Sequence, residues 1–376
     1  MNHLSKKILF VVSEDWYFFS HRIHLARYAI QCGYEVGLLS NFSTHKNEIE
    51  NIGVITFDWN LNRSSKNIVK EFKSINRIKD CIKLFKPTLV HSVALKPVLY
   101  SSIACSFLSF KNKVFALAGL GYIFTSDRKR MKILRAILKL SFKILLKGNK
   151  TTLILQNPED QNTILKQNII SKNRIRLIRG AGVDISKFYL SPILKGLPLI
   201  GLPSRMLWAK GINDFIHCAK EINKHKTQAR FVLIGTPDKE NPDAVPTEKL
   251  KEWQSAGIIE WWGYRSDMVD VYKQSTIICL PTIYGEGLPK TLLEAASCGR
   301  PIVTYDVPGC REIVEDGYNG YLLKPRELDK LVTIILNLIT NPNLCKVMGI
   351  NGRKIVEKNF TQEKIAKQTL NVWEKY

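Results

Sequence analysis

The sequence lacks any long hydrophobic run. No stretch of its 376 residues approaches the roughly 18 uninterrupted apolar positions of a membrane-spanning helix, so we expect no transmembrane segment. The apolar run Ile8–Val12 is too short for a signal peptide, and no cleavage site follows it. Paired cysteines are also lacking, because the eight cysteines are scattered, with no Cys-x-x-Cys pair and no histidine at metal spacing. This pattern favours a reducing compartment over a disulfide framework.

Acidic residues are few compared with basic ones. The chain has 33 Asp and Glu against 56 Lys and Arg, which leaves a net charge of +23. A field of this sign attracts polyanions, namely nucleic acid, anionic lipid or phosphorylated substrates. Hydrophobic residues make up 45% of the chain, which indicates a globular protein, and its length is enough for two domains, each with its own core.

Apolar, β-rich runs alternate with helical patterns through almost the whole chain. This alternation predicts an α/β protein with parallel strands and crossover helices, such as those at 22–31 and 68–85. The stretch 181–198 has weak periodicity with Gly and Pro and predicts a linker, and 362–376 predicts a final helix. The predicted strands are Ile8–Ser13, Glu35–Ser40, Val54–Trp59, Thr88–Val93, Val114–Ala118, Leu153–Gln156, Ile175–Arg179, Leu199–Pro203, Phe231–Gly235, Ile258–Trp262, Ile277–Leu280, Ile302–Tyr305 and Gly320–Leu323.

Two glutamates, Glu286 and Glu294, lie eight positions apart where a predicted strand is followed by a helix. Pro289 suits the first turn of that helix, because its missing N–H costs nothing there. Free N–H groups at a helix start favour a phosphate, and each carboxylate can accept hydrogen bonds from a pair of sugar hydroxyls. These groups therefore suit a nucleotide sugar at the carboxyl edge of a parallel sheet. The alternative is that Glu286 only complements the helix dipole. In both cases Glu294 is expected on the helix surface, dispensable for packing.

Arg205 and Lys210 lie five positions apart, between a predicted strand and a helix that starts near Gly211. Two cations at a strand end can clamp a pyrophosphate and offset the charge on a departing nucleoside diphosphate. The alternative is two solvated basic residues in a chain that is rich in them. The sequence has no Asp-x-Asp pair that would hold a divalent metal on the diphosphate, so we expect neither a metal nor a cofactor.

The run Gly285-Glu-Gly-Leu-Pro, followed by Leu-Leu-Glu-Ala and Cys-Gly-Arg-Pro-Ile-Val, resembles the signature of family 4 of the retaining glycosyltransferases. The resemblance implies the GT-B fold, in which two Rossmann-like domains face a cleft and a carboxyl-terminal helix crosses back to the first domain. The expected parts are residues 1–188, which bind the acceptor and face the membrane, residues 189–358, which bind the nucleotide sugar, and residues 359–376, the returning helix.

Residue roles follow from the same resemblance. Glu286 is expected to contact the transferred sugar, with Arg205 and Lys210 on the donor phosphates, and these three form the expected catalytic group. Glu294 is expected to bind the ribose. The further donor contacts expected are Gly287, Leu288 and Pro289, together with Gly263 and Tyr264, whose backbone would contact the nucleobase. Transfer would retain the anomeric configuration and need no metal.

The first half departs from the broad family, because 13–22 is not Gly-rich and 118–124 contains no histidine. Its motifs are more similar to those of bacterial enzymes that extend undecaprenyl-diphosphate-linked glycans in O-antigen, capsule or protein-glycan assembly, including lipid-linked α-1,3-N-acetylgalactosaminyltransferases. These motifs are His21-Arg22, Val90–Pro97, Gly119-Leu-Gly121 and Gln156-Asn157. That similarity implies a UDP-linked donor such as an N-acetylhexosamine, a polyprenyl-diphosphate-linked saccharide acceptor and an α-linkage. A strand histidine such as His91 is more often structural. The residues expected at the acceptor are His21, Arg22, His91, Lys96, Gly119 and Gly121.

The segment 128–150 is the candidate for membrane contact. It holds nine Lys and Arg and no acid. Six of these cations recur at steps of three or four with apolar residues between them, namely Arg128, Lys132, Arg135, Lys139, Lys143 and Lys147. A basic amphipathic helix of this kind can lie in the headgroup plane of an anionic leaflet, which predicts a peripheral protein on the inner face of the cytoplasmic membrane. The alternative is a crossover helix whose basic side is only solvated. The cations expected at the membrane include Lys132, Arg135, Lys139 and Lys143.

Three other functions remain open. A nucleotide-sugar 2-epimerase on the same fold would turn over the donor without an acceptor. A basic nucleic-acid-binding protein would bind nucleic acid with a steep salt dependence. Aromatic residues do not interleave regularly with the cations of 128–150, where Phe142 is a single aromatic residue, and no reader motif is present. We therefore expect no nucleic-acid partner. A membrane-binding protein without catalysis is disfavoured, since both glutamates and both cations are present.

Overall fold

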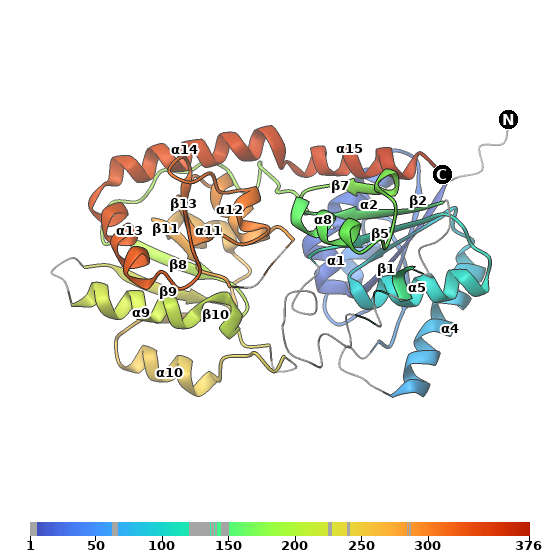
Figure 1. Cartoon of the computed structure of the whole chain (residues 1–376), viewed down its shortest axis with the longest axis horizontal. Helices are drawn as coiled ribbons and strands as arrows, with labels where there is room; N and C mark the ends of the chain where they lie inside the picture. The colour runs from blue at the N-terminus through green and yellow to red at the C-terminus, as the bar shows by residue number, and fades with distance from the viewer. Residues whose placement is uncertain are drawn as a thin grey trace. The chain divides into compact units, whose positions relative to one another are not determined.

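The computed structural model describes residues 6–61, 67–119, 136, 139, 141–143, 150–224, 228–238, 241–283, 285 and 287–376. The chain divides into two compact units. The first unit comprises Met1–Ala181 with Gln362–Tyr376, and the second comprises Gly182–Thr361. Each unit is a parallel β-sheet covered by helices, as the alternating sequence pattern predicts (Figure 1).

The first unit contains, in its described residues, a seven-stranded parallel sheet in the order β3-β2-β1-β4-β5-β6-β7. The strand order reverses between β1 and β4, and such a switch point is where open α/β sheets bind ligands. Strands such as β1, β4 and β5 are almost wholly buried, which explains their continuous apolar sequences. The strands are β1 (Lys7–Glu14), β2 (Glu35–Asn41), β3 (Ile55–Asp58), β4 (Leu89–Val93), β5 (Lys113–Leu117), β6 (Thr151–Leu155) and β7 (Ile175–Leu177).

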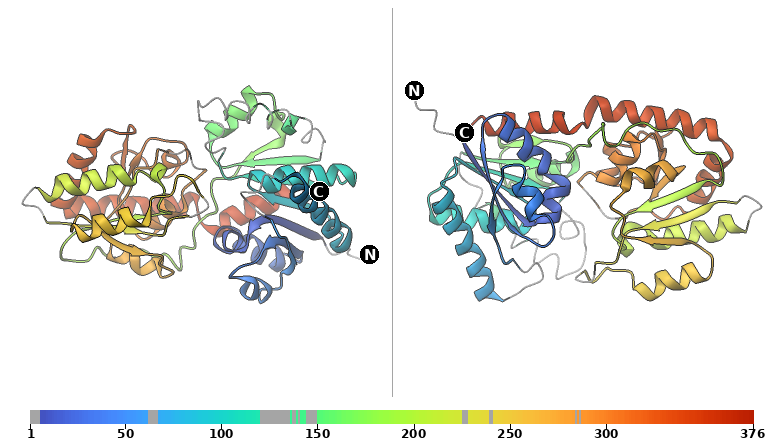
Figure 2. Two further views of the ribbon diagram at one scale, coloured as in Figure 1. Left: turned by 90° about the horizontal axis from the view of Figure 1, so that it is seen from below. Right: turned by 180° about the vertical axis from the view of Figure 1, so that it is seen from behind.

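Helices cover both faces of this sheet. α2 and α15 pack on one face with Ile8, Phe10 and Val12, and α4 and α5 pack on the other with Leu9 and Val11. The blue helices α1 and α2 stand against the first of these faces in the right-hand view of Figure 2. The helices are α1 (Asp15–His21), α2 (Ile23–Gln31), α3 (Lys46–Glu50), α4 (Ile68–Phe85), α5 (Leu95–Phe107), α8 (Pro158–Lys166) and α15 (Gln362–Trp373), and a 3-10 turn η1 spans Lys172–Arg174.

The carboxyl-terminal helix α15 packs on the first unit, beside α2, which confirms the expected return of the chain (Figure 1). Trp373 on α15 donates a hydrogen bond from Nε1 to Nδ1 of His91, at 2.9 Å, inside the core. Tyr376 and Thr152 form a second hydrogen bond between hydroxyls at 2.7 Å. These polar contacts fix the position of the helix, because both partners would be unsatisfied if it moved away.

The second unit contains, in the part that the structure describes, a six-stranded parallel sheet in the order β10-β9-β8-β11-β12-β13. Its switch point lies between β8 and β11. The strands are β8 (Leu199–Pro203), β9 (Arg230–Ile234), β10 (Glu260–Gly263), β11 (Ile277–Leu280), β12 (Ile302–Tyr305) and β13 (Gly320–Leu323). The helices are α9 (Ile212–Asn223), α10 (Thr247–Ser255), α11 (Met268–Gln274), α12 (Lys290–Ser297), α13 (Leu328–Thr340) and α14 (Pro342–Asn359), with 3-10 turns η2 (Trp208–Lys210) and η3 (Cys310–Glu312).

The predicted linker is held against the second unit by two arginines. Arg300 is fully buried and donates from Nη2 to the carbonyl oxygens of Ser191 and Pro192, at 2.8 and 3.2 Å. Arg353 donates from Nη1 to the carbonyl oxygen of Phe188 at 2.9 Å. Burial lowers the pKa of Arg300 to about 10, which still leaves it charged at neutral pH. This part of the linker is therefore an integral part of the second unit.

Among the described residues, no single helix has the length and hydropathy to cross a bilayer, while α13 and α14 pass that test only as a pair, bent by 101° at their junction. All eight cysteines are free, and Cys32 alone among them is exposed. The candidate membrane segment 128–150 lies outside the described residues except at 136, 139, 141–143 and 150. Lys139 and Lys143 are helical and half-buried, near the buried Phe142, whereas Lys132 and Arg135 are not described.

Candidate donor-binding site

Two loops that carry predicted donor residues meet at the switch point of the second unit. One loop follows β8 and contains Arg205 and Lys210, and the other follows β11 and leads to α12. The backbone N–H of Ile283 and the hydroxyl of Thr282 donate to the carbonyl oxygen of Ala209, at 3.0 and 3.2 Å. The structure therefore brings the two sequence motifs together at one edge of the sheet.

Gly211 is required at this junction for two reasons. It precedes α9 with a left-handed φ of 77°, and a Cβ added there would lie 1.9 Å from the carbonyl oxygen of Pro281. Only glycine permits both the conformation and the close approach of the two loops. The Lys-Gly pair in the sequence thus has a local explanation: glycine joins the loops and places Lys210 directly before the helix.

Arg205 has an acidic partner that the sequence interpretation missed. Its Nη1 donates to Oδ2 of Asp238, in the loop after β9, at 2.8 Å, and the arginine side chain remains 48% exposed. The same loop region is fixed by Asp243, whose carboxylate accepts from the backbone N–H of Ala209 at 2.8 Å. Arg205 is therefore oriented without being buried, so that its guanidinium stays accessible to an anion.

The glutamate loop is described only in part, because Glu286 and Tyr284 lie outside the described residues. Leu288 is buried, and Pro289 immediately precedes the first residue of α12, with φ −64°. The proline position agrees with the expected helix start. Gly287 precedes them, so the residues predicted to meet the donor lie directly before the N-terminus of α12.

Glu294 is not the exposed helix residue that the sequence analysis expects. It is only 6% exposed, and both carboxylate oxygens have partners. Lys290 lies one turn earlier on α12 with its Nζ 3.0 Å from Oε1, and Tyr272 on α11 donates its hydroxyl to Oε2 at 3.0 Å. The expectation of a Glu294 on the helix surface, dispensable for packing, is therefore wrong, because the side chain is buried and accepts a hydrogen bond from Tyr272 of α11. The local sequence carries no pattern that would indicate this neighbour.

The turn after β10 joins the same edge of the sheet. The backbone N–H of Gly235 donates to the carbonyl oxygen of Gly263 at 2.7 Å, and a Cβ added to Gly235 would lie 1.9 Å from the carbonyl oxygen of Ser204. Gly263 has a left-handed φ of 65°, and the next residue, Tyr264, is 75% exposed. The turns after β8, β9 and β10 are thus in contact, with the predicted nucleobase residues on the outermost of them.

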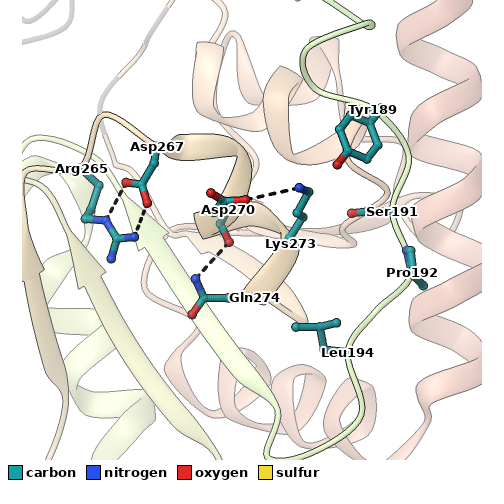
Figure 3. Close-up of a pocket in the computed structure, with 9 residues that line it drawn as sticks. All are labelled: Tyr189, Ser191, Pro192, Leu194, Arg265, Asp267, Asp270, Lys273 and Gln274. Carbon is teal, nitrogen blue, oxygen red and sulfur yellow. Dashed lines mark hydrogen bonds and ion pairs between the residues drawn. The ribbon is translucent and has the colours of Figure 1, made fainter.

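A separate cavity of about 540 Å³ lies between the linker and α11 (Figure 3). Arg265 and Asp267 are paired across its wall, Lys273 points toward Asp270 at 3.3 Å, and Tyr189 faces them from the linker. None of the predicted donor residues lines this cavity. The sequence motifs expected to bind the donor therefore lie at the switch point and not at this cavity.

The residues predicted for the acceptor lie in the first unit, and most are engaged in protein contacts. The ring of His91 is 1% exposed and accepts the hydrogen bond from Trp373. Burial and the neighbouring charge of Arg22 lower the pKa of His91 to about 3, so the ring is neutral. Arg22 itself is buried, and His21 stacks on Tyr17 with ring centroids 4.4 Å apart.

The other acceptor candidates are also placed in the first unit. Lys96, at the start of α5, pairs with Glu71 at 3.1 Å and remains a quarter exposed. Gly119 follows β5 with a left-handed φ of 98°, while Gly121 lies outside the described residues. Asn157 of the Gln-Asn motif accepts a hydrogen bond from the backbone N–H of Asp160 and caps α8. The structure therefore gives Asn157 a structural role.

Asp15 is a buried residue that the sequence analysis did not single out. Its carboxylate accepts hydrogen bonds from the backbone N–H groups of Ser43, Thr44 and His45, at 2.9, 2.8 and 2.7 Å, and from the hydroxyl of Ser43. Burial alone would raise the pKa of Asp15, but the hydrogen bonds from His45, Thr44 and Ser43 outweigh it, and the pKa is lowered. Asp15 thereby fixes the loop after β2 against the end of β1.

Comparisons with known proteins agree with this arrangement. A family described as "Glycosyl transferases group 1" matches residues 191–355, and one described as "Glycosyl transferase 4-like" matches residues 7–157. The second of these matches covers most of the amino-terminal half and the first covers most of the carboxyl-terminal half, and together they identify the chain as a glycosyltransferase. Among the described residues of this glycosyltransferase, no three His, Cys, Asp or Glu side chains gather as a metal site would require.

Two characterised relatives are similar over most of the glycosyltransferase. The N,N'-diacetylbacillosaminyl-diphospho-undecaprenol α-1,3-N-acetylgalactosaminyltransferase of Campylobacter jejuni is 24% identical over 80% of this chain and 82% of its own. The UDP-Gal:α-D-GlcNAc-diphosphoundecaprenol α-1,3-galactosyltransferase of Escherichia coli is 24% identical over 78% of this chain and 76% of its own. Both relatives act on sugars linked to undecaprenyl diphosphate.

A solved structure confirms the GT-B fold. Anabaena Alr3699/HepE, in complex with UDP and glucose, superposes with a TM-score of 0.79 over 99% of this chain and all of that one, at 18% sequence identity. At this identity the likeness establishes the fold alone.

Proposed function

We propose that the enzyme is a retaining, metal-independent glycosyltransferase that moves a sugar from a UDP-linked donor, such as a UDP-N-acetylhexosamine, to a polyprenyl-diphosphate-linked saccharide. The product would carry an α-linkage and would enter surface polysaccharide or protein-glycan synthesis. The observation that carries this proposal is the contact, at the switch point of the second unit, between the loop that contains Arg205 and Lys210 and the loop that leads to α12, the helix of Glu294.

Each of these groups has a place in the proposed reaction. Arg205 and Lys210 would bind the donor diphosphate together with backbone N–H groups at the start of α12. Their charge would stabilise the nucleoside diphosphate as it leaves, in the place of a metal ion. Glu294 would accept hydrogen bonds from the ribose, and Glu286, for which the support is its sequence motif, would contact the transferred sugar.

The choice of donor and acceptor is supported by the relatives. The Escherichia coli relative is named for a UDP-linked donor, and both undecaprenol-linked relatives are similar to this chain across most of its length. The acceptor would be held by the first unit, where Lys96 is the predicted contact that combines a positive charge with exposure. A phosphorylated acceptor also agrees with the net charge of +23.

An anionic membrane surface is the proposed partner of the first unit, which would place the enzyme on the inner face of the cytoplasmic membrane. Besides segment 128–150, the outer side of α4 has the composition for such contact. Val69 and Phe72 are 63% and 59% exposed, and the exposed Lys70 and Lys73 lie next to them. Apolar side chains between cations can sink to the acyl boundary while the cations meet anionic headgroups.

A panel of nucleotide sugars tests the proposed function. The purified enzyme is incubated with each donor, with and without undecaprenyl-diphosphate-linked saccharides, and the release of nucleoside diphosphate is followed. We expect release that depends on the acceptor, with at least one UDP-sugar. Release without any acceptor, or an epimerised free sugar nucleotide, would instead identify an epimerase, and steep salt-dependent nucleic-acid binding without donor turnover would identify a nucleic-acid-binding protein.

A further inference from the structure

The carboxylate of Glu294 has one protein partner on each oxygen. Lys290 contacts Oε1 and Tyr272 contacts Oε2, both at 3.0 Å. An ionised carboxylate offers about four acceptor positions, two on each oxygen. One position on each oxygen therefore remains for a ligand, and the 2′- and 3′-hydroxyls of a ribose are two neighbouring donors that match this pair.

We propose that Tyr272 and Lys290 are positioning residues for the donor, which hold the Glu294 carboxylate so that each oxygen accepts from one ribose hydroxyl. This proposal rests on the proposed function, because it takes the ribose of a nucleotide as the ligand of Glu294. Neither residue needs to touch the nucleotide. Their effect would be on the preference for a ribose over a deoxyribose, because only the ribose supplies both hydroxyls.

Tyr272 can hold the carboxylate because it is immobile and remains a donor. It is fully buried on α11, and its ring meets Phe188 edge-on with centroids 6.0 Å apart. Burial, and then the negative charge of Glu294, raise the pKa of Tyr272 well above its usual value, so the hydroxyl keeps its proton. Its only other near acceptor among the described residues is the carbonyl oxygen of Thr291, at the longer distance of 3.3 Å.

Lys290 complements Tyr272 from the other side of the carboxylate. It is the first residue of α12, four positions before Glu294, and its side chain is 23% exposed while that of Glu294 is 8% exposed. A buried carboxylate without a cation would be costly, so the pair keeps the charge compensated. Because the two partners come from different helices, they fix the carboxylate plane as well as its position.

The test compares UDP with 2′-deoxy-UDP by calorimetry. For the wild type we expect tighter binding of UDP than of 2′-deoxy-UDP. For Tyr272→Phe we expect the dissociation constant of 2′-deoxy-UDP, divided by that of UDP, to fall about tenfold, which corresponds to the loss of roughly one charged hydrogen bond. Tyr305→Phe is the matched control, because Tyr305 is also buried and donates to a carboxylate, Asp214, at 2.6 Å, away from Glu294. Its ratio should equal that of the wild type.

A second variant tests the same proposal in case Tyr272→Phe does not fold. Lys290→Met should lower the same ratio, while Lys249→Met, which breaks an exposed pair with Glu252, should not. If either test variant binds both nucleotides more weakly but keeps the wild-type ratio, Tyr272 and Lys290 serve only the packing of α12, and the positioning role is wrong. If the wild type itself shows no preference for UDP over 2′-deoxy-UDP, Glu294 does not bind the ribose. That result would contradict the role given to Glu294 in the proposed function, independently of Tyr272 and Lys290.

Discussion

Glu294 is a buried residue with two partners, and this determines what its substitution does. Replacement by alanine removes the acceptor from both Lys290 and Tyr272, so it should cost stability as well as nucleotide binding. Replacement by glutamine keeps the volume and one acceptor oxygen. The two substitutions therefore separate the packing role from the ligand role.

We predict that Glu294→Gln weakens UDP binding at least about tenfold, because hydrogen bonds to a charged acceptor contribute roughly 1.5–3 kcal/mol. Glu294→Ala should weaken binding by at least as much and also lower the melting temperature. Calorimetry and thermal unfolding give the two readouts. Unchanged nucleotide affinity in a folded Glu294→Gln protein would contradict the ribose role.

Arg205 and Lys210 should act mainly on turnover. The charge that they meet grows as the sugar–phosphate bond breaks, so their contribution is larger in the transition state than in the bound donor. We predict that Arg205→Ala and Lys210→Ala lower kcat about a hundredfold, with a smaller rise in the donor KM. Lys220→Ala, at an exposed site on α9, is the control. A raised KM with unchanged kcat would assign them to ground-state binding alone.

Asp15 makes the stability of the first unit depend on pH. Its pKa is lower in the folded state than in the unfolded chain, so its contribution is full above the unfolded value, near 3.8, and is lost as the pH falls through the folded value. We predict that Asp15→Asn destabilises the first unit by roughly 2 kcal/mol at neutral pH and flattens the acid dependence. The amides of residues 43–45 should exchange faster. Exchange as slow as in the wild type would show that Asp15 does not hold this loop.

At the scale of elements, the strands were the most predictable part of the molecule. Each of the thirteen strands found in the described residues coincides with a predicted run, and β8, β11, β12 and β13 match to the residue, because buried parallel strands require continuous apolar sequence. Helix α4 also matches its predicted span, Ile68–Phe85, since Asn67 caps its start and Lys86 ends it in a left-handed conformation. Residues close in the sequence determine where these strands and this helix begin and end, so the boundaries can be predicted from the sequence.

Segment 128–150 supports a prediction at the same scale. Reversal of Lys132, Arg135, Lys139 and Lys143 to Glu should release the enzyme from anionic vesicles and lower activity on a long-chain acceptor, while activity on a short soluble analogue survives. Vesicle binding by the wild type should weaken as salt rises. Vesicle sedimentation measures both effects.

A control for this variant should carry the same change in net charge on the second unit. Reversal of the exposed Lys220, Lys251, Lys346 and Lys354 to Glu provides it. If the 128–150 variant stays on vesicles and keeps its activity, the basic stripe is a solvated helix face. If both variants leave the membrane equally, the effect is one of total charge rather than of this segment.

At the scale of the whole molecule, the sequence predicts the GT-B fold and the elements of the donor site but not the partners that orient its residues. Lys210 and Gly211 lie in one motif, and the contact of Gly211 with Pro281 follows from the switch point between β8 and β11. Asp238, Tyr272 and Asp15 act on residues 22 to 33 positions away, on other elements. Such pairings depend on tertiary packing, for which a single sequence carries no local pattern.

We propose that this enzyme transfers a sugar from a nucleotide to a lipid-linked acceptor with retention of configuration. The most direct measurement is the anomeric configuration of the new linkage, determined by NMR on the product formed from an α-linked UDP-sugar and an undecaprenyl-diphosphate-linked saccharide, in the presence of a chelator. We expect an α-linked product at full rate, with one UDP released for each sugar transferred. A β-linkage, or activity that the chelator abolishes, would contradict it.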